Sequence, residues 1–149
     1  MLGRFPRRSC SKKGLQLIHT AVHRSTSPKR ILIADDEPHI RRILQTLLEM
    51  AGFEVDLRHD GTDALEAIQG GDHYDLILLD IMMPGATGLE VLGKIRGMEA
   101  RKSTPVVILT AKGQDADRQA AFSLGADDFL AKPFSPKKLL LFCCLEVVF

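Results

Sequence analysis

The chain has 149 residues, of which 45% are hydrophobic and 26% charged, and its formal net charge is +1. This length is typical of one globular domain with a sizeable core, and the composition excludes a disordered polymer. No apolar run approaches the ~20 residues of a membrane-spanning helix, and the cysteines Cys10, Cys143 and Cys144 lack disulfide or zinc spacing, which favours a reducing, cytoplasmic location.

The near-neutral total conceals a strongly basic beginning. Residues 1–30 hold eight of the twenty lysines and arginines and no acid, whereas residues 31–149 hold the other twelve and all nineteen acids. Such a tail has the composition of a transit peptide, of a nucleic-acid-binding arm, or of a solvated extension translated from an upstream start codon. Because the apolar stretch Leu15–Ile18 is too short for a signal-peptide core, we favour the last and assign residues 1–28 to a disordered basic extension.

From residue 29 onward, strand and helix patterns alternate. Residues 31–34 form a continuous apolar run, which predicts a strand buried on both faces. The next apolar residues have the spacing of one helical stripe that ends at Gly52, and they are Ile40, Ile43, Leu44, Leu47, Leu48 and Ala51. Phe53, Val55 and Leu57 then alternate with charged residues, so we expect a strand with one solvated face at a sheet edge.

The same alternation recurs to the end of the chain. Further apolar strands are predicted at 76–79, 106–109 and 129–130, and further helices around Ala64–Ile68, Leu89–Ile95, Asp115–Leu124 and from Ser135-Pro136 onward. Five consecutive β–α units predict an α/β fold with a doubly wound, five-stranded parallel sheet covered by helices on both faces. We expect the strand order 2-1-3-4-5, which places the alternating strand at one edge.

Polar residues follow the predicted strands at the point where each one ends. Asp35 and Asp36 follow the first strand, Asp80 the third, Thr110 the fourth and Lys132 the fifth. In an open parallel sheet these ends meet in one crevice. Like charges ~4 Å apart repel by about 4 kcal/mol per pair at an effective dielectric of ~20. The single ammonium leaves a deficit that a hard divalent cation with oxygen ligands would fill, and Mg²⁺ suits it best.

Each of these residues also has a plain structural interpretation. Asp36 could cap the helix that follows it, Asp80 could be a turn residue, Thr110 a cap and Lys132 a solvated charge. Their convergence from separate strands favours a shared site instead. A carboxylate nucleophile, a cation site, a hydroxyl and an ammonium together suit phosphoryl transfer onto Asp80.

Four sequence blocks carry a family resemblance. They are Asp35-Asp36-Glu37, Leu78-Leu79-Asp80-Ile81-Met82-Met83-Pro84-Gly85, Leu109-Thr110-Ala111 and Lys132-Pro133-Phe134. In order and spacing they resemble the receiver domain of two-component response regulators (the CheY-like superfamily), over residues 29–138. The resemblance implies a flavodoxin-like fold in which Asp80 accepts a phosphoryl group from the phosphohistidine of a sensor histidine kinase or phosphotransfer protein. The domain would catalyse its own phosphorylation and dephosphorylation without being a conventional turnover enzyme.

The resemblance also implies roles for individual residues. Mg²⁺ would be bound by the carboxylates of Asp35, Asp36 and Asp80 and by the Met82 backbone carbonyl. Thr110 and Lys132 would contact the phosphoryl oxygens. Phe129 would be a switch aromatic coupled to Thr110, the bond before Pro133 would be cis, and a homodimer would form through the helix near 115–124, the strand at 129–130 and the last helix.

Two features depart from the family pattern. Where the family commonly has Met-Asp-Gly, this chain has Ala86-Thr87-Gly88, and we expect Thr87 to cap the following helix. Residues 139–149 are apolar on all sides apart from Glu146, whereas receiver domains usually close with an amphipathic helix. We interpret this segment as the end of a truncated or frameshifted chain that once continued into an output domain, the alternative being a dimer or partner surface.

Two other functions remain as alternatives. The chain would be a truncated DNA-binding transcriptional regulator if its output domain is missing, with nucleic acid bound by that domain or by the basic tail. A metal-dependent phosphohydrolase with an aspartyl nucleophile usually needs an acid two residues after the nucleophile. Here that position is Met82, which argues against steady turnover.

Overall fold

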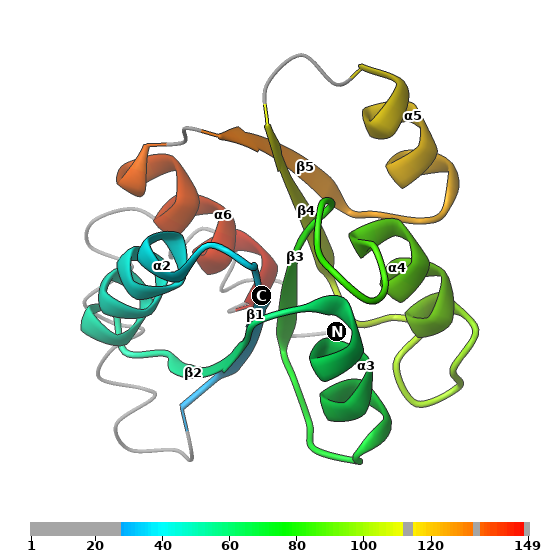
Figure 1. Ribbon diagram of the computed structural model, residues 1–149. Helices are drawn as coiled ribbons and strands as arrows, with labels where there is room; N and C mark the ends of the chain where they lie inside the picture. Colours follow the sequence, from blue (N-terminus) through cyan, green and yellow to red (C-terminus); the bar gives the residue numbers. More distant parts are fainter. Residues whose placement is uncertain (1–27, 112–114, 133–134, 148–149) are drawn as a thin grey trace.

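The computed structural model describes residues 28–111, 115–132 and 135–147, where strands and helices alternate (Figure 1). The strands are β1 (Arg30–Ala34), β2 (Glu54–Arg58), β3 (Leu76–Asp80), β4 (Val106–Ala111) and β5 (Asp128–Lys132). The helices are α2 (Pro38–Met50), α3 (Gly61–Gln69), α4 (Gly88–Arg96), α5 (Asp115–Ser123) and α6 (Pro136–Val147). Residues 1–27 of the predicted basic extension, with Cys10, lie outside the described part.

The strands form one parallel sheet in the order β2-β1-β3-β4-β5. This confirms the predicted order and places the alternating strand, β2, at an edge. The central strand β3 is buried along its whole length, because helices cover both faces of the sheet.

The helices form two layers, one on each face (Figure 1). Helices α2 and α6 cover one face, where Leu44, Leu48 and Leu139 pack on Ile31 and Ile33 of β1. Helices α3, α4 and α5 cover the other face, where a second apolar cluster includes Ala64, Ile68, Val91, Leu92 and Ala121. The polar residues at the strand ends belong to neither apolar cluster, which leaves the carboxyl edge of the sheet available for a site.

Helix α2 buries a narrower stripe than its sequence predicted. Leu44 and Leu48 are fully buried, but Ile43 is 46% exposed and Ala51 is also exposed. As an outer-layer helix, α2 contacts the sheet only along the middle of its apolar stripe, so the residues at the border of the stripe stay in contact with water.

Thr87 caps α4, as predicted from the sequence. Its hydroxyl accepts a hydrogen bond from the Glu90 amide at 3.2 Å, and the Glu90 carboxylate accepts one from the Thr87 amide at 2.9 Å. This reciprocal capping box satisfies two backbone donors that a helix start leaves open. The departure from the family pattern at residues 86–88 therefore leaves the start of α4 intact.

Helix α6 places part of the apolar C-terminal segment in the core. Leu139 and Cys143 are fully buried, whereas Leu141 is exposed. The Ser135 hydroxyl accepts from the Lys138 amide at 3.0 Å and caps the helix. Within the described ranges, no helix is both long and apolar enough to cross a lipid bilayer.

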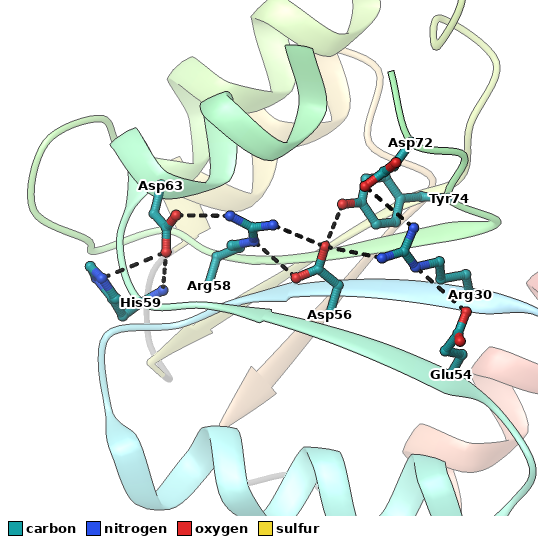
Figure 2. Close-up of polar contacts among 8 residues, drawn as sticks. All are labelled: Arg30, Glu54, Asp56, Arg58, His59, Asp63, Asp72 and Tyr74. Atoms are coloured by element: carbon teal, nitrogen blue, oxygen red, sulfur yellow. Dashed lines mark hydrogen bonds and ion pairs between the residues drawn. The ribbon is translucent and has the colours of Figure 1, made fainter. Parts of the chain in front are cut away.

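A polar network lines the side of β2 that faces α3 (Figure 2). The Arg58 guanidinium binds the Asp56 carboxylate through two nitrogens, at 2.9 and 3.2 Å, and the Tyr74 hydroxyl donates to the same carboxylate. Arg30 Nη2 lies 3.7 Å from Asp56 Oδ2. Burial alone would raise the pKa of Asp56, but the hydrogen bonds from Arg58 and Tyr74 and the charges of both arginines hold it below its usual value. The Asp56 and Arg58 side chains of this edge strand are thus paired with each other, and Asp56 is also paired with Tyr74 and Arg30.

Candidate functional site

The polar residues predicted at the strand ends meet at one edge of the sheet. Asp80 is the last residue of β3, Lys132 is the last of β5, and Asp35 follows β1 directly. Thr110 lies inside β4, opposite Ala131 of β5, and is buried. Because all the strands run in the same direction, their carboxyl ends converge at this edge.

Three carboxylates form the centre of the site. Asp35, Asp36 and Asp80 each offer an oxygen, and these atoms lie within 4.8 Å of one another. Asp35 is fully buried, Asp80 is 5% exposed, and Asp36 is exposed. The N-cap position of α2 is held by Glu37, without a side-chain cap. The alternative interpretation of Asp36 as the helix cap is therefore wrong.

The Lys132 ammonium binds this carboxylate cluster directly. Its Nζ lies 2.7 Å from Asp35 Oδ2 and 3.5 Å from Asp80 Oδ2. Burial alone would lower the pKa of Lys132, but the hydrogen bond to Asp35 and the charges of Asp35 and Asp80 raise it. The lysine therefore remains an ammonium group that joins the end of β5 to the ends of β1 and β3.

Sequence reasoning missed two residues that complete the surroundings of Asp35. Glu37 Oε1 lies 3.2 Å from Lys132 Nζ, and the Glu37 amide donates to Asp35 Oδ1 at 2.9 Å. Arg41 Nη1 donates to the Asp35 carbonyl at 2.6 Å. The acidic run 35–37 was the only local signal for Glu37, and no local pattern marked Arg41. Both contacts arise because α2 starts shortly after Asp35, with Glu37 at its N-cap position and Arg41 near its first turn.

The electrostatic environment of the cluster acts most strongly on Asp80. Burial, together with the negative charge of Asp35, raises the pKa of Asp80 to about 7, and the nearby Lys132 ammonium opposes this only in part. Three carboxylates with one ammonium leave the site short of positive charge. A second cation would restore the balance and keep Asp80 ionised.

The donor set fits a hard divalent cation. Carboxylate oxygens from Asp35, Asp36 and Asp80 are close enough to share one ion, and Asp36 lies on the solvent side, where water can complete the coordination. Mg²⁺ typically takes a few protein oxygens and retains several waters. The cluster therefore has the oxygen chemistry that this ion requires.

The segment that carries Met82 lies between β3 and α4. Met82 is two residues beyond Asp80 and is 70% exposed. The Ile81 amide donates to the Leu109 carbonyl, and the Gly88 amide donates to the Ile81 carbonyl, both at 3.0 Å. These bonds tie the segment to β4 and to the start of α4.

Thr110 and Phe129 lie on the same face of the sheet. Phe129 pairs with Ile108 of β4, and Thr110 is two residues beyond Ile108, so their side chains point the same way. Phe129 is half-buried, with its ring centre 6.3 Å from that of Phe122 and 5.7 Å from the Arg118 guanidinium. Pro133, predicted to follow a cis bond, lies outside the described residues.

The family model described as "response regulator receiver domain" matches residues 31–142. The transcriptional regulatory protein ResD of Bacillus subtilis is 44% identical over 117 residues, which cover 78% of this chain and 47% of ResD. The chain thus spans about half the length of the curated relatives that it matches.

Solved structures agree with the family match. The protein TrrA of Thermotoga maritima, in complex with Mg²⁺ and BeF, superimposes with a TM-score of 0.66 at 39% identity, covering 75% of this chain and 93% of TrrA. The receiver domain of a Pseudomonas aeruginosa sensor histidine kinase, with a magnesium ion coordinated in its active site cleft, has a TM-score of 0.75 at 29% identity. It covers 81% of this chain and 98% of that domain.

Proposed function

The chain belongs to the family of response-regulator receiver domains, and we propose that it is a phosphoryl-accepting switch in which Asp80 is the acceptor. One observation carries the proposal. Oxygens of Asp35, Asp36 and Asp80 lie within 4.8 Å of one another, and the Lys132 ammonium contacts two of these residues. We assign the receiver unit to residues 29–138, and we place its action in the cytoplasm with a histidine kinase or phosphotransfer protein as donor.

The transfer itself is an in-line substitution at phosphorus. An oxygen of Asp80 attacks the phosphoryl group as the phosphorus–nitrogen bond of the donor histidine breaks, and the electron pair leaves with the imidazole nitrogen. A bound Mg²⁺ would supply positive charge to the carboxylates and to the phosphoryl oxygens. Attack by water on the phosphorus later breaks its bond to the Asp80 oxygen, which releases inorganic phosphate and restores the free carboxylate. The domain thus catalyses both steps on itself and is not a conventional turnover enzyme.

The remaining site residues would stabilise the transferred group. Lys132 reaches Asp80 from β5, and its ammonium would donate to a phosphoryl oxygen. The Thr110 hydroxyl, buried on β4, would donate to another. Asp35, Asp36, Asp80 and the Met82 carbonyl are the proposed Mg²⁺ ligands. These charges would be arranged before the phosphoryl group arrives, which lowers the cost of the transition state.

Phosphorylation of Asp80 would change the surface of the domain on the face that carries Thr110 and Phe129. A Thr110 hydroxyl drawn toward the phosphoryl group would make room for the Phe129 ring beside it. Phe122, whose ring lies against Phe129, and Leu124 are each 42% exposed, and such apolar surface favours contact with a partner. We propose that α5, β5 and α6 form a homodimer face that responds to phosphorylation.

Acetyl phosphate supplies the direct test. With Mg²⁺ present, the protein is expected to incorporate about one phosphoryl group, and Asp80→Asn is expected to incorporate none because the nucleophile is lost. Intact-mass spectrometry measures the added phosphate, and Asp72→Asn, an exposed aspartate of the β2 network, is the matched control. Unmodified wild-type protein, or equal labelling of Asp80→Asn, would contradict the proposal.

A second candidate follows from the relatives. ResD is named a transcriptional regulatory protein and is about twice as long as the matched segment, so we also propose that this chain corresponds to the receiver half of a DNA-binding regulator. On that basis the described domain does not bind DNA by itself. A gel shift at low and high salt is expected to show no shift for a version starting at Ser27, and a shift retained by that version would contradict this assignment.

A further inference from the structure

The segment after Asp80, residues 81–87, rests directly on the first turn of α3. The Gly61 amide donates to the Pro84 carbonyl at 3.1 Å. A Cβ on Gly61 would overlap the Ala86 backbone, and one on Gly85, whose φ is +84°, would overlap the Thr62 hydroxyl. Because no flexible side chain separates Gly61 from the segment, a shift of the first turn of α3 must displace residues 81–87.

Arg58 holds this first turn of α3 to the edge strand (Figure 2). Its Nη1 donates to Asp63 Oδ1 at 3.0 Å, while the rest of the same guanidinium binds Asp56. The Asp63 amide in turn donates to Asp60 Oδ1 at 2.8 Å, which caps α3. Arg58 is paired with Ala34 in the sheet, so it lies beside the residue that precedes the metal-binding aspartates.

We propose that Arg58 is a positioning residue for the Mg²⁺ site, acting through α3 on the segment that carries the Met82 carbonyl. The proposal rests on the proposed function, which makes that carbonyl a ligand. Arg58 contacts Asp56 and Asp63, and its effect passes from Asp63 to the first turn of α3, from Gly61 to Pro84, and so to Met82. Groups that orient a metal ligand from outside the coordination sphere commonly govern affinity.

Mg²⁺ titration calorimetry on the full chain tests this with a matched pair of variants. Arg58→Met and Arg30→Met each remove one arginine that binds Asp56, but only Arg58 contacts α3. Arg58→Met is expected to raise the Kd for Mg²⁺ about three- to tenfold, since one ligand among several is loosened. Loss of a nearby positive charge would by itself tighten Mg²⁺ binding, so weaker binding is opposite in sign to a bare charge effect.

The Arg30→Met control separates positioning from general destabilisation. Arg30 begins β1 at the other end of the strand from the aspartates, so its loss is expected to lower stability in urea while leaving the Kd for Mg²⁺ within about twofold of wild type. Equal Kd values for wild type and Arg58→Met, or equal weakening in the two arginine variants, would overturn the proposal. No Mg²⁺ binding by the wild-type chain would instead overturn the proposed function, and this assignment with it.

If Arg58→Met fails to fold, Asp63→Asn provides a second test of the link between Arg58 and α3. This variant weakens the bond between Arg58 and α3 while leaving Arg58 on Asp56. At high ionic strength, which screens the lost charge of Asp63, it is expected to raise the Kd for Mg²⁺ about threefold. An Asp63→Asn protein that binds Mg²⁺ as tightly as wild type would overturn the role of this link.

Discussion

Asp80→Asn is expected to raise the free energy of unfolding of the metal-free protein by on the order of 2 kcal/mol at pH 8. Burial and the charge of Asp35 raise the pKa of Asp80 to about 7, so an ionised Asp80 destabilises the folded state when no metal is present. Asparagine has nearly the same shape and carries no charge. The gain is smaller than the pKa alone implies, because the Lys132 ammonium loses one partner. Urea unfolding in EDTA measures it.

The sign of the pH dependence follows from the same pKa. The folded protein holds the Asp80 proton up to about pH 7, whereas the unfolded chain releases it near pH 4. Between these values the folded state binds more protons, so Asp80 makes wild-type stability fall as the pH rises. The advantage of Asp80→Asn should therefore grow from about pH 4 to 7 and then remain constant.

Asp56→Asn is the matched contrast. The hydrogen bonds and positive charges around Asp56 outweigh its burial and lower its pKa, so its charge stabilises the fold above its unfolded pKa and loses this effect as the pH falls through the lower, folded value. The same chemical change should therefore destabilise the protein at pH 8. Equal effects of the two substitutions at pH 8, or a lower stability of Asp80→Asn, would contradict the role of burial at Asp80.

Mg²⁺ is expected to reverse the order of wild type and Asp80→Asn. A ligand at a hundredfold its Kd stabilises the folded state by about 2.7 kcal/mol, and wild type should gain this while Asp80→Asn, lacking one proposed ligand, gains much less. Repeating the urea series with Mg²⁺ and with Ca²⁺ measures the gain and its selectivity. A gain of the same size in both proteins would show that the ion binds elsewhere.

Gly61→Ala is expected to lower the free energy of unfolding by about 3 kcal/mol or more. A Cβ at this position would overlap the carbonyl group and amide nitrogen of Ala86. Backbone atoms cannot rotate away as a side chain can, so α3 or the segment 81–87 must move. Chemical denaturation at pH 8 with EDTA measures the loss.

Gly93→Ala provides the same substitution in an open place. Gly93 lies inside α4, and a Cβ there meets nothing within 4 Å. Alanine favours a helix over glycine by about 0.8–1.0 kcal/mol, so this variant should be slightly more stable than wild type. If the two variants were equally stable, the contact between α3 and the segment 81–87 would not be as tight as described.

Much of the fold could be predicted because its causes are local. The continuous apolar runs of β1 and β3 and the alternation in β2 report directly on which faces are buried, and the structure confirms the resulting strand order. The alignment of Asp35, Asp80, Thr110 and Lys132 followed from one further rule, that parallel strands end at the same edge.

Other features depend on contacts between residues that are far apart in the sequence, which no local sequence pattern can predict. Glu37 and Lys132 are 95 residues apart in sequence and meet only because β1 and β5 end at the same edge. Likewise, the alternation in β2 predicted a solvated face, whereas Tyr74, Arg30 and α3 pair with its charged residues (Figure 2). Sequence periodicity specifies which face a residue occupies, but not which partner arrives there.

The amino-acid sequence by itself determined the α/β class, the edge position of β2 and the set of groups at the strand ends, because hydrophobic periodicity and residue type express these directly. Only the tertiary structure decided how far Asp80 is buried, and hence its pKa near 7, and only it linked Arg58 to α3. Burial and through-space contact arise from all elements packing together, so they exist only once the chain has folded.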